Sequence, residues 1–142
     1  AADRFLEDMP DAEQAEFNRF CAEHAHWLDD YALFIALREH TKIYDWTRWP
    51  APVARHQTDA LAQQRETLRS EIARQQVLQY WFFGQWRALR VYAAEKGVHI
   101  IGDVPIYVQH QSADVWANRP LFKLDEAGQP LFVSGSPPDL FS

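Results

Sequence analysis

The sequence predicts an α/β fold that is mostly helical, with about one parallel strand and a β-hairpin. Residues 1–96 hold one glycine and three prolines, whereas residues 97–142 hold the other four glycines and five prolines. Because glycine and proline interrupt helices and mark turns, the first part is predicted to be helical and the second to contain strand, turn and loop. A short β-branched run directly after the long helical part is also typical of a βαβ unit.

Two helices are expected in the first third of the chain. Asp11 is predicted to cap the first helix, because Gln14 follows it at the spacing of a capping box. The second helix covers residues 27–37 and is apolar around much of its circumference, which predicts that it is largely buried. Residues 41–52 are rich in tryptophan and proline and are predicted to form an aromatic loop.

A long helical tract is predicted from residue 53 to residue 96, with a break near residues 67–70. The first half of the tract has the pattern of a surface helix, and the second half, residues 77–92, is strongly apolar. The aromatic run at residues 80–86 is predicted to be core packing. Gly97 is predicted to end the tract in the left-handed conformation.

A strand and a hairpin are predicted in the last third. Residues 98–101 form a β-branched run that is typical of a parallel strand buried on both faces. Residues 121–124 and 130–133 flank a polar turn in which Gly128 can supply a positive φ. This pattern predicts a β-hairpin.

The composition argues against several functional classes. The chain has 14 Lys and Arg against 20 Asp and Glu, a formal net charge of -6, which disfavours nucleic-acid binding. The single cysteine, Cys21, excludes an internal disulfide framework and indicates a reducing compartment, so a cytoplasmic location is expected. No apolar run approaches the roughly 18 residues of a membrane span, so no membrane partner is expected. No phosphate-binding loop is found, and no cofactor is predicted.

Asp103 is the polar residue with the clearest functional signal. It follows the predicted strand at residues 98–101, and ligands of parallel α/β folds bind at the carboxyl ends of strands. A carboxylate there can accept hydrogen bonds from substrate hydroxyls. A Gly-Asp pair is also common in turns, so spacing alone leaves both interpretations open.

The C-terminal loop is a second candidate site. Two consecutive prolines stiffen it, and Asp139 and Phe141 would offer a polar and an apolar contact that suit a carbohydrate. An ordinary surface loop is the alternative.

Cys21 and His24 share a helix face, but a zinc site needs three or four ligands, so no metal site is predicted. The adjacent Asp29 and Asp30 diverge on a helix and do not suit a catalytic pair.

Three stretches of the sequence resemble one enzyme family. They are Trp-Leu-Asp-Asp-Tyr-Ala-Leu-Phe at residues 27–34, the aromatic run and the Gly-Asp-Val-Pro-Ile-Tyr-Val motif within residues 79–108, and residues 112–139 with their final Gly-Ser-Pro-Pro-Asp. They are similar to the 4-α-glucanotransferases, the amylomaltases or disproportionating enzymes of glycoside hydrolase family 77. The resemblance runs from about residue 16 to the end, with the segments in the family's order.

The resemblance implies a (β/α)8 TIM barrel and the transfer of α-1,4-glucan segments between maltooligosaccharides by a retaining double displacement, without a cofactor. Asp103 matches the aspartate after the third barrel strand, which helps to organise the sugar at the cleavage subsite. A substrate-covering loop is matched by Pro138, Asp139, Leu140 and Phe141. Leu140 stands where many relatives carry tyrosine, so the resemblance does not imply an aromatic or hydroxyl contact to glucan at that position.

The length indicates an internal fragment of such an enzyme. The 142 residues are well short of the roughly 250 of a closed barrel. No segment matches the nucleophile or the acid/base of a retaining enzyme, so the isolated chain is expected to be inactive. Residues 1–96 are predicted to be a helical subdomain and barrel helices. Residues 97–142 are predicted to be a barrel strand, a hairpin and the substrate-covering loop.

Two further expectations concern the isolated chain. A lone barrel strand would expose both of its edges, so self-association is expected. Most of the tryptophans are expected in the helix core, which leaves Trp46, Trp49 and Trp116 as the ones to test for a position near a bound glucan. The alternative to an enzyme fragment is a stand-alone, non-catalytic helical module that binds glucan or a protein partner through its aromatic side chains.

Overall fold

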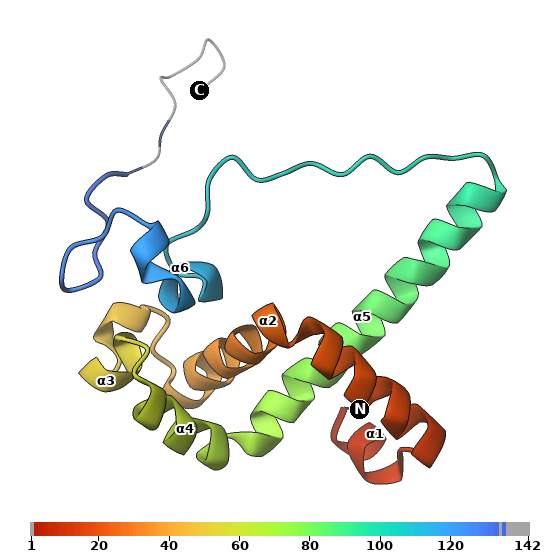
Figure 1. Ribbon diagram of the computed structural model, residues 1–142, viewed down its shortest axis with the longest axis horizontal. Coiled ribbons are helices and arrows are strands. Elements are labelled where there is room, and N and C mark those ends of the chain that lie inside the picture. Colours follow the sequence, from red (N-terminus) through yellow and green to blue (C-terminus); the bar gives the residue numbers. More distant parts are fainter. Residues whose placement is uncertain (1, 134, 136–142) are drawn as a thin grey trace.

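The structure, a computed structural model, describes residues 2–133 and Gly135 as packed helices, a long extended segment and a small C-terminal unit (Figure 1). The helical elements are α1 (Ala2–Asp8), α2 (Asp11–Thr41), the 3-10 helix η1 (Trp46–Arg48), α3 (Ala51–Ala54), α4 (Thr58–Thr67), α5 (Arg69–Glu95), α6 (Ala113–Ala117) and the 3-10 helix η2 (Arg119–Leu121). None of the helices in the described residues has the length and hydropathy of a membrane span.

The two long helices, α2 and α5, pack against each other, and α1 lies against α5 (Figure 1). The ring of Tyr80 from α5 meets the rings of Phe17 and Phe20 from α2 edge to face, each at 5.6 Å between centroids. Val77, one turn before Tyr80, is fully buried beside Phe17. This contact buries Phe17, Phe20 and Val77 between the two helices.

A second and larger core lies where the C-terminal half of α2 meets η1, α3, α4 and α6. Trp46 and Trp116 are both 0% exposed, and Phe34 of α2 packs against the Trp116 ring at 5.7 Å. The burial predicted for residues 27–37 is confirmed at Leu28, Ala32, Leu33, Phe34, Ala36 and Leu37. This core joins the last third of the chain to the helices.

The start of the helical part differs from the prediction. The two expected helices form one helix of 31 residues, and α1 precedes it without having been predicted. Asp11 is the first helical residue rather than the cap, because Gln14 N–H donates to the carbonyl of Pro10 at 2.9 Å. Pro10, with an extended ψ of 151°, is therefore the N-cap residue, and its carbonyl accepts the first hydrogen bond of the helix.

The break and the end of the long tract are as predicted. Leu68 separates α4 from α5, within the expected interval. Gly97 has a φ of 70° and follows the last turn of α5. Gly97 N–H donates to Ala94 O at 3.0 Å and Val98 N–H donates to Ala93 O at 2.9 Å. These two bonds form a Schellman motif, which explains the glycine.

The distribution of burial along the tract is the reverse of the prediction. The first half is packed, with Leu61 and Leu68 in the large core, whereas Phe82, Leu89 and Trp86 are exposed. The reason is visible in the arrangement of the helices: α5 continues past α2, so its last turns have no helix beside them in the described part of the chain (Figure 1). The predicted core role of residues 80–86 is thus wrong for Phe82 and Trp86.

The predicted strand and hairpin need correction. Residues 98–108 are extended and exposed, and they cross from α5 to α6 without a strand beside them among the described residues (Figure 1). The hairpin is reduced to a single antiparallel bridge between Leu124 and Pro130. Leu121 belongs to η2, and Pro130 has no N–H to donate to a ladder, which limits the pairing. The positive φ of Gly128, 86°, is as predicted.

We expect the isolated chain to self-associate, because the extended segment offers unpaired backbone groups and apolar side chains such as Ile101, which is 93% exposed. Sedimentation velocity at increasing concentration should show dimers or larger species. Ile101→Lys should weaken the association, whereas His99→Lys, at a polar position of the same segment, should change it less. A monomer at every concentration would contradict this expectation.

Candidate functional site

Asp103 lies on the exposed segment between α5 and α6. Its Oδ1 atom accepts a hydrogen bond from the N–H of Val104 at 2.8 Å. This local bond leaves the carboxylate exposed at the surface, where it can accept hydrogen bonds from a ligand. The role predicted for Asp103 stays a prediction. The other candidate residues, Pro138, Asp139, Leu140 and Phe141, lie outside the described residues.

A groove of about 460 Å³ begins a few residues beyond Asp103. One wall is formed by residues 107–110 and the other by residues 122–133. Tyr107 and Phe132 supply aromatic rings to it, and the Lys123 ammonium lies 5.3 Å from the centre of the Phe132 ring. Aromatic rings with a few polar groups are typical of sites for small ligands.

The segment that carries Asp103 rejoins the helices at His110 and Gln111. Trp46 Nε1–H donates to the His110 carbonyl at 2.8 Å, and Trp46 N–H donates to Gln111 Oε1 at 3.2 Å. Gln111 Nε2 in turn donates to Asp45 Oδ1 at 3.0 Å. Partial burial would raise the pKa of Asp45, but hydrogen bonds from Thr47 and Gln111 outweigh it and lower the pKa.

The three tryptophans singled out for a position near a glucan are core residues instead, with Trp49 4% exposed beside the fully buried Trp46 and Trp116. Trp116 Nε1–H donates to Val53 O at 3.0 Å, and Trp49 Nε1–H also donates to a backbone carbonyl. Buried indoles with satisfied N–H groups have no surface left for a sugar, so this hypothesis is wrong.

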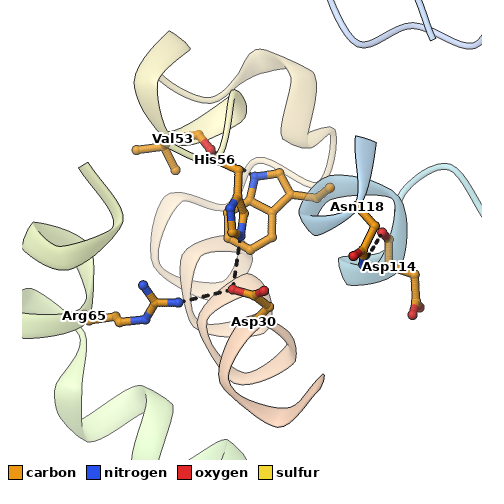
Figure 2. A network of polar contacts seen from close by, with 7 residues as sticks. Asp30, Val53, His56, Arg65, Asp114 and Asn118 are labelled. Atoms are coloured by element: carbon orange, nitrogen blue, oxygen red, sulfur yellow. Dashed lines mark hydrogen bonds and ion pairs between the residues drawn. The ribbon is translucent and has the colours of Figure 1, made fainter. Parts of the chain in front are cut away.

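A polar network that the sequence did not predict joins α2 to α4 and to the turn after α3 (Figure 2). Asp30 Oδ1 accepts from His56 Nε2 and from Arg65 Nη2, both at 3.1 Å. The hydrogen bond from His56 is the largest cause that lowers the pKa of Asp30, and the charge of Arg65 adds to it. The His56 ring also meets Trp116 edge to face at 4.6 Å. These partners lie far apart in the sequence, which explains why no local pattern revealed them.

Cys21 and His24 do not form a metal site in the structure. Burial, with the nearby charge of Asp29, raises the pKa of the Cys21 thiol to about 11, so the thiol is protonated at neutral pH. The His24 ring packs between the rings of Phe20, at 4.6 Å, and Phe83, at 5.0 Å. The described residues contain no group of three side chains suited to hold a metal ion.

Comparison with known proteins decides the family. The family model described as 4-alpha-glucanotransferase matches residues 1–142. The chain belongs to the 4-alpha-glucanotransferase family. The 4-alpha-glucanotransferase of Thermus thermophilus is 43% identical over 138 residues, which are 97% of this chain and 28% of the relative. The chloroplastic/amyloplastic enzyme of Arabidopsis thaliana is 45% identical over 116 residues, which are 82% of this chain and 20% of the relative.

The fold comparison agrees with the family assignment. An amylomaltase from Streptococcus agalactiae, solved in complex with acarbose, matches with a TM-score of 0.89 and 38% identity, over 99% of this chain and 28% of that chain. The resemblance predicted from the sequence is confirmed. Amylomaltase is a TIM-barrel enzyme, so this chain corresponds to part of such a barrel protein and spans about 28% of its length.

The network around Asp30 predicts a pH-dependent contribution to stability. Because the folded pKa of Asp30 is lowered, its contribution is present above the unfolded pKa of about 3.9 and is lost as the pH falls through the folded pKa. Asp30→Asn should therefore reduce the free energy of unfolding by roughly 1–3 kcal/mol at pH 7 and by little below about pH 3. Urea unfolding followed by circular dichroism measures this difference.

The control for Asp30→Asn is Asp59→Asn, at an exposed position in the first turn of α4. This control should cost little at either pH. An equal cost of Asp30→Asn at neutral and at acidic pH would show that the charge of Asp30 does not stabilise the fold.

Proposed function

We propose that this chain is part of a 4-α-glucanotransferase that transfers α-1,4-glucan segments between maltooligosaccharides. The observation that supports it most is the family match along the whole chain, with a TM-score of 0.89 to an amylomaltase solved with acarbose. The chain spans 28% of the Thermus thermophilus relative, so the activity is proposed for the whole protein of which these residues form a part.

The proposed reaction is a retaining double displacement. A carboxylate nucleophile attacks the anomeric carbon while a carboxylic acid protonates the leaving oxygen, and the covalent glycosyl-enzyme is then attacked by the 4-hydroxyl of an acceptor sugar. The acid, now a carboxylate, removes the proton from that hydroxyl. No segment of this chain matches the family's nucleophile or acid/base, so in this proposal both belong to other parts of the enzyme.

Asp103 is proposed to bind the sugar at the cleavage subsite. An ionised carboxylate accepts hydrogen bonds from hydroxyl groups, and charge-assisted bonds of this kind are stronger than neutral ones. The exposed position of Asp103 supports this role, since its second oxygen has no ionic partner among the residues that the structure describes. Pro138, Asp139, Leu140 and Phe141 are proposed to cover the bound glucan.

The alternative of a stand-alone binding module is not favoured. Its main support was the number of aromatic side chains, and the structure buries Trp46, Trp49 and Trp116 in the core. The cytoplasmic location and the absence of a cofactor remain predictions from the sequence.

The proposal is tested in a hybrid enzyme in which this chain replaces the corresponding 138 residues of the Thermus thermophilus relative. The hybrid should release glucose from maltotriose, and Asp103→Asn should lower kcat/KM about 10- to 100-fold, because the loss of a hydrogen bond to a charged group costs about 1.5–3 kcal/mol. Coupled glucose detection measures the rate.

Two controls accompany the hybrid. Glu95→Gln, at an exposed carboxylate near the end of α5, should leave the rate unchanged. The isolated 142-residue chain should release no glucose. Glucose release by the isolated chain that Asp103→Ala abolishes would overturn the proposal that the catalytic carboxylates lie elsewhere, and full activity of the Asp103→Asn hybrid would overturn the role of Asp103.

A further inference from the structure

His110 connects the two walls of the groove that begins at Tyr107. Its Nε2 atom lies 2.7 Å from the carbonyl oxygen of Gly128, which belongs to the turn of the opposite wall. Its own backbone carbonyl accepts from the indole of Trp46 at 2.8 Å. A single residue therefore links the segment that carries Asp103, the turn and the helical core.

Gln111 selects the tautomer of the His110 ring. Gln111 Oε1 accepts from Trp46 N–H, and Gln111 Nε2 donates to Asp45 Oδ1, so the orientation of its amide is set from both sides. The same Nε2 lies 3.2 Å from His110 Nδ1. Because an amide nitrogen can only donate, Nδ1 must accept, and the ring hydrogen must sit on Nε2, where it donates to Gly128 O.

The turn that contains Gly128 packs directly against the Trp46 ring. A Cβ atom on Gly128 would lie 2.7 Å from Trp46 Cη2 and 2.9 Å from Cζ3, and the backbone of Gly128 has a φ of 86°. The indole cannot move away, because it is fully buried and its N–H is hydrogen-bonded. Gln129 Nε2 adds a bond of 2.8 Å to Thr47 Oγ1. The turn is thus held at one place on the helical core.

We propose that His110 is a positioning residue, which fixes the two walls of this groove, residues 107–110 and 122–133, relative to each other. The Gln111 amide orients the His110 ring as the Nε2–H tautomer. The inference rests on the proposed function in so far as Asp103 is taken to bind glucan. A displacement of about 1 Å at a reacting centre can lower a rate about 100-fold, so a fixed anchor seven residues from Asp103 matters to the reaction.

The direct test is the distance between the walls in the isolated chain. Spin labels at Val108→Cys and Leu131→Cys, exposed positions on the two walls, are introduced in a Cys21→Ala background, and the distance distribution is measured by pulsed electron resonance. His110→Ala should broaden the distribution. His110→Gln should keep it narrow, because its amide can donate to Gly128 O and accept from Gln111. The control is His40→Ala, at the exposed end of α2.

The same variants are tested in the active hybrid enzyme. His110→Ala should lower kcat/KM for maltotriose about 10- to 100-fold, and His110→Gln should restore it to within about threefold. A distribution that His110→Ala leaves unchanged, or a His110→Gln variant as impaired as His110→Ala, would overturn the proposal. If the unsubstituted hybrid is inactive, the proposed function fails, while the spin-label distances still decide whether His110 fixes the two walls.

Discussion

Two buried indoles hold the last third of the chain on the helices. The N–H groups of Trp46 and Trp116 donate to the carbonyls of His110 and Val53, each across more than sixty residues of sequence. A buried indole without a partner for its N–H would lose about 1–3 kcal/mol. The two bonds and the packing of the rings therefore favour one position of the 110–133 region on the core, and the groove depends on that position.

The segment with Asp103 is fixed at its two ends and extended between them. The Schellman motif at Gly97 stops α5 and sets the direction in which the chain leaves it. Thirteen residues later, His110 returns the chain to the core through Trp46 and to the turn through Gly128. In the proposed enzyme, this arrangement presents Asp103 on an otherwise unpaired stretch that other parts of the barrel would flank.

Features that depend on neighbouring residues could be predicted from the sequence. The left-handed Gly97, the break at Leu68 and the positive φ of Gly128 follow from local backbone chemistry. The family was also recognised from local motifs. Burial was harder to predict, because it depends on which elements meet: Trp116 was a candidate for contact with glucan and is core, whereas Trp86 was expected in a core and is 37% exposed. The strand predicted at residues 98–101 is an extended segment in the structure for the same reason: a strand forms only when it is hydrogen-bonded to a partner strand, and none lies beside it among the described residues.

The most direct test of this account compares these two tryptophans in the isolated chain by urea unfolding. Trp116→Ala should reduce the free energy of unfolding by about 3–5 kcal/mol, because it opens a cavity in the core. Trp86→Ala should reduce it by less than about 1 kcal/mol, because its side chain is partly exposed. Equal losses for the two variants, or a small loss for Trp116→Ala, would contradict the claim that the buried indoles hold the structure together.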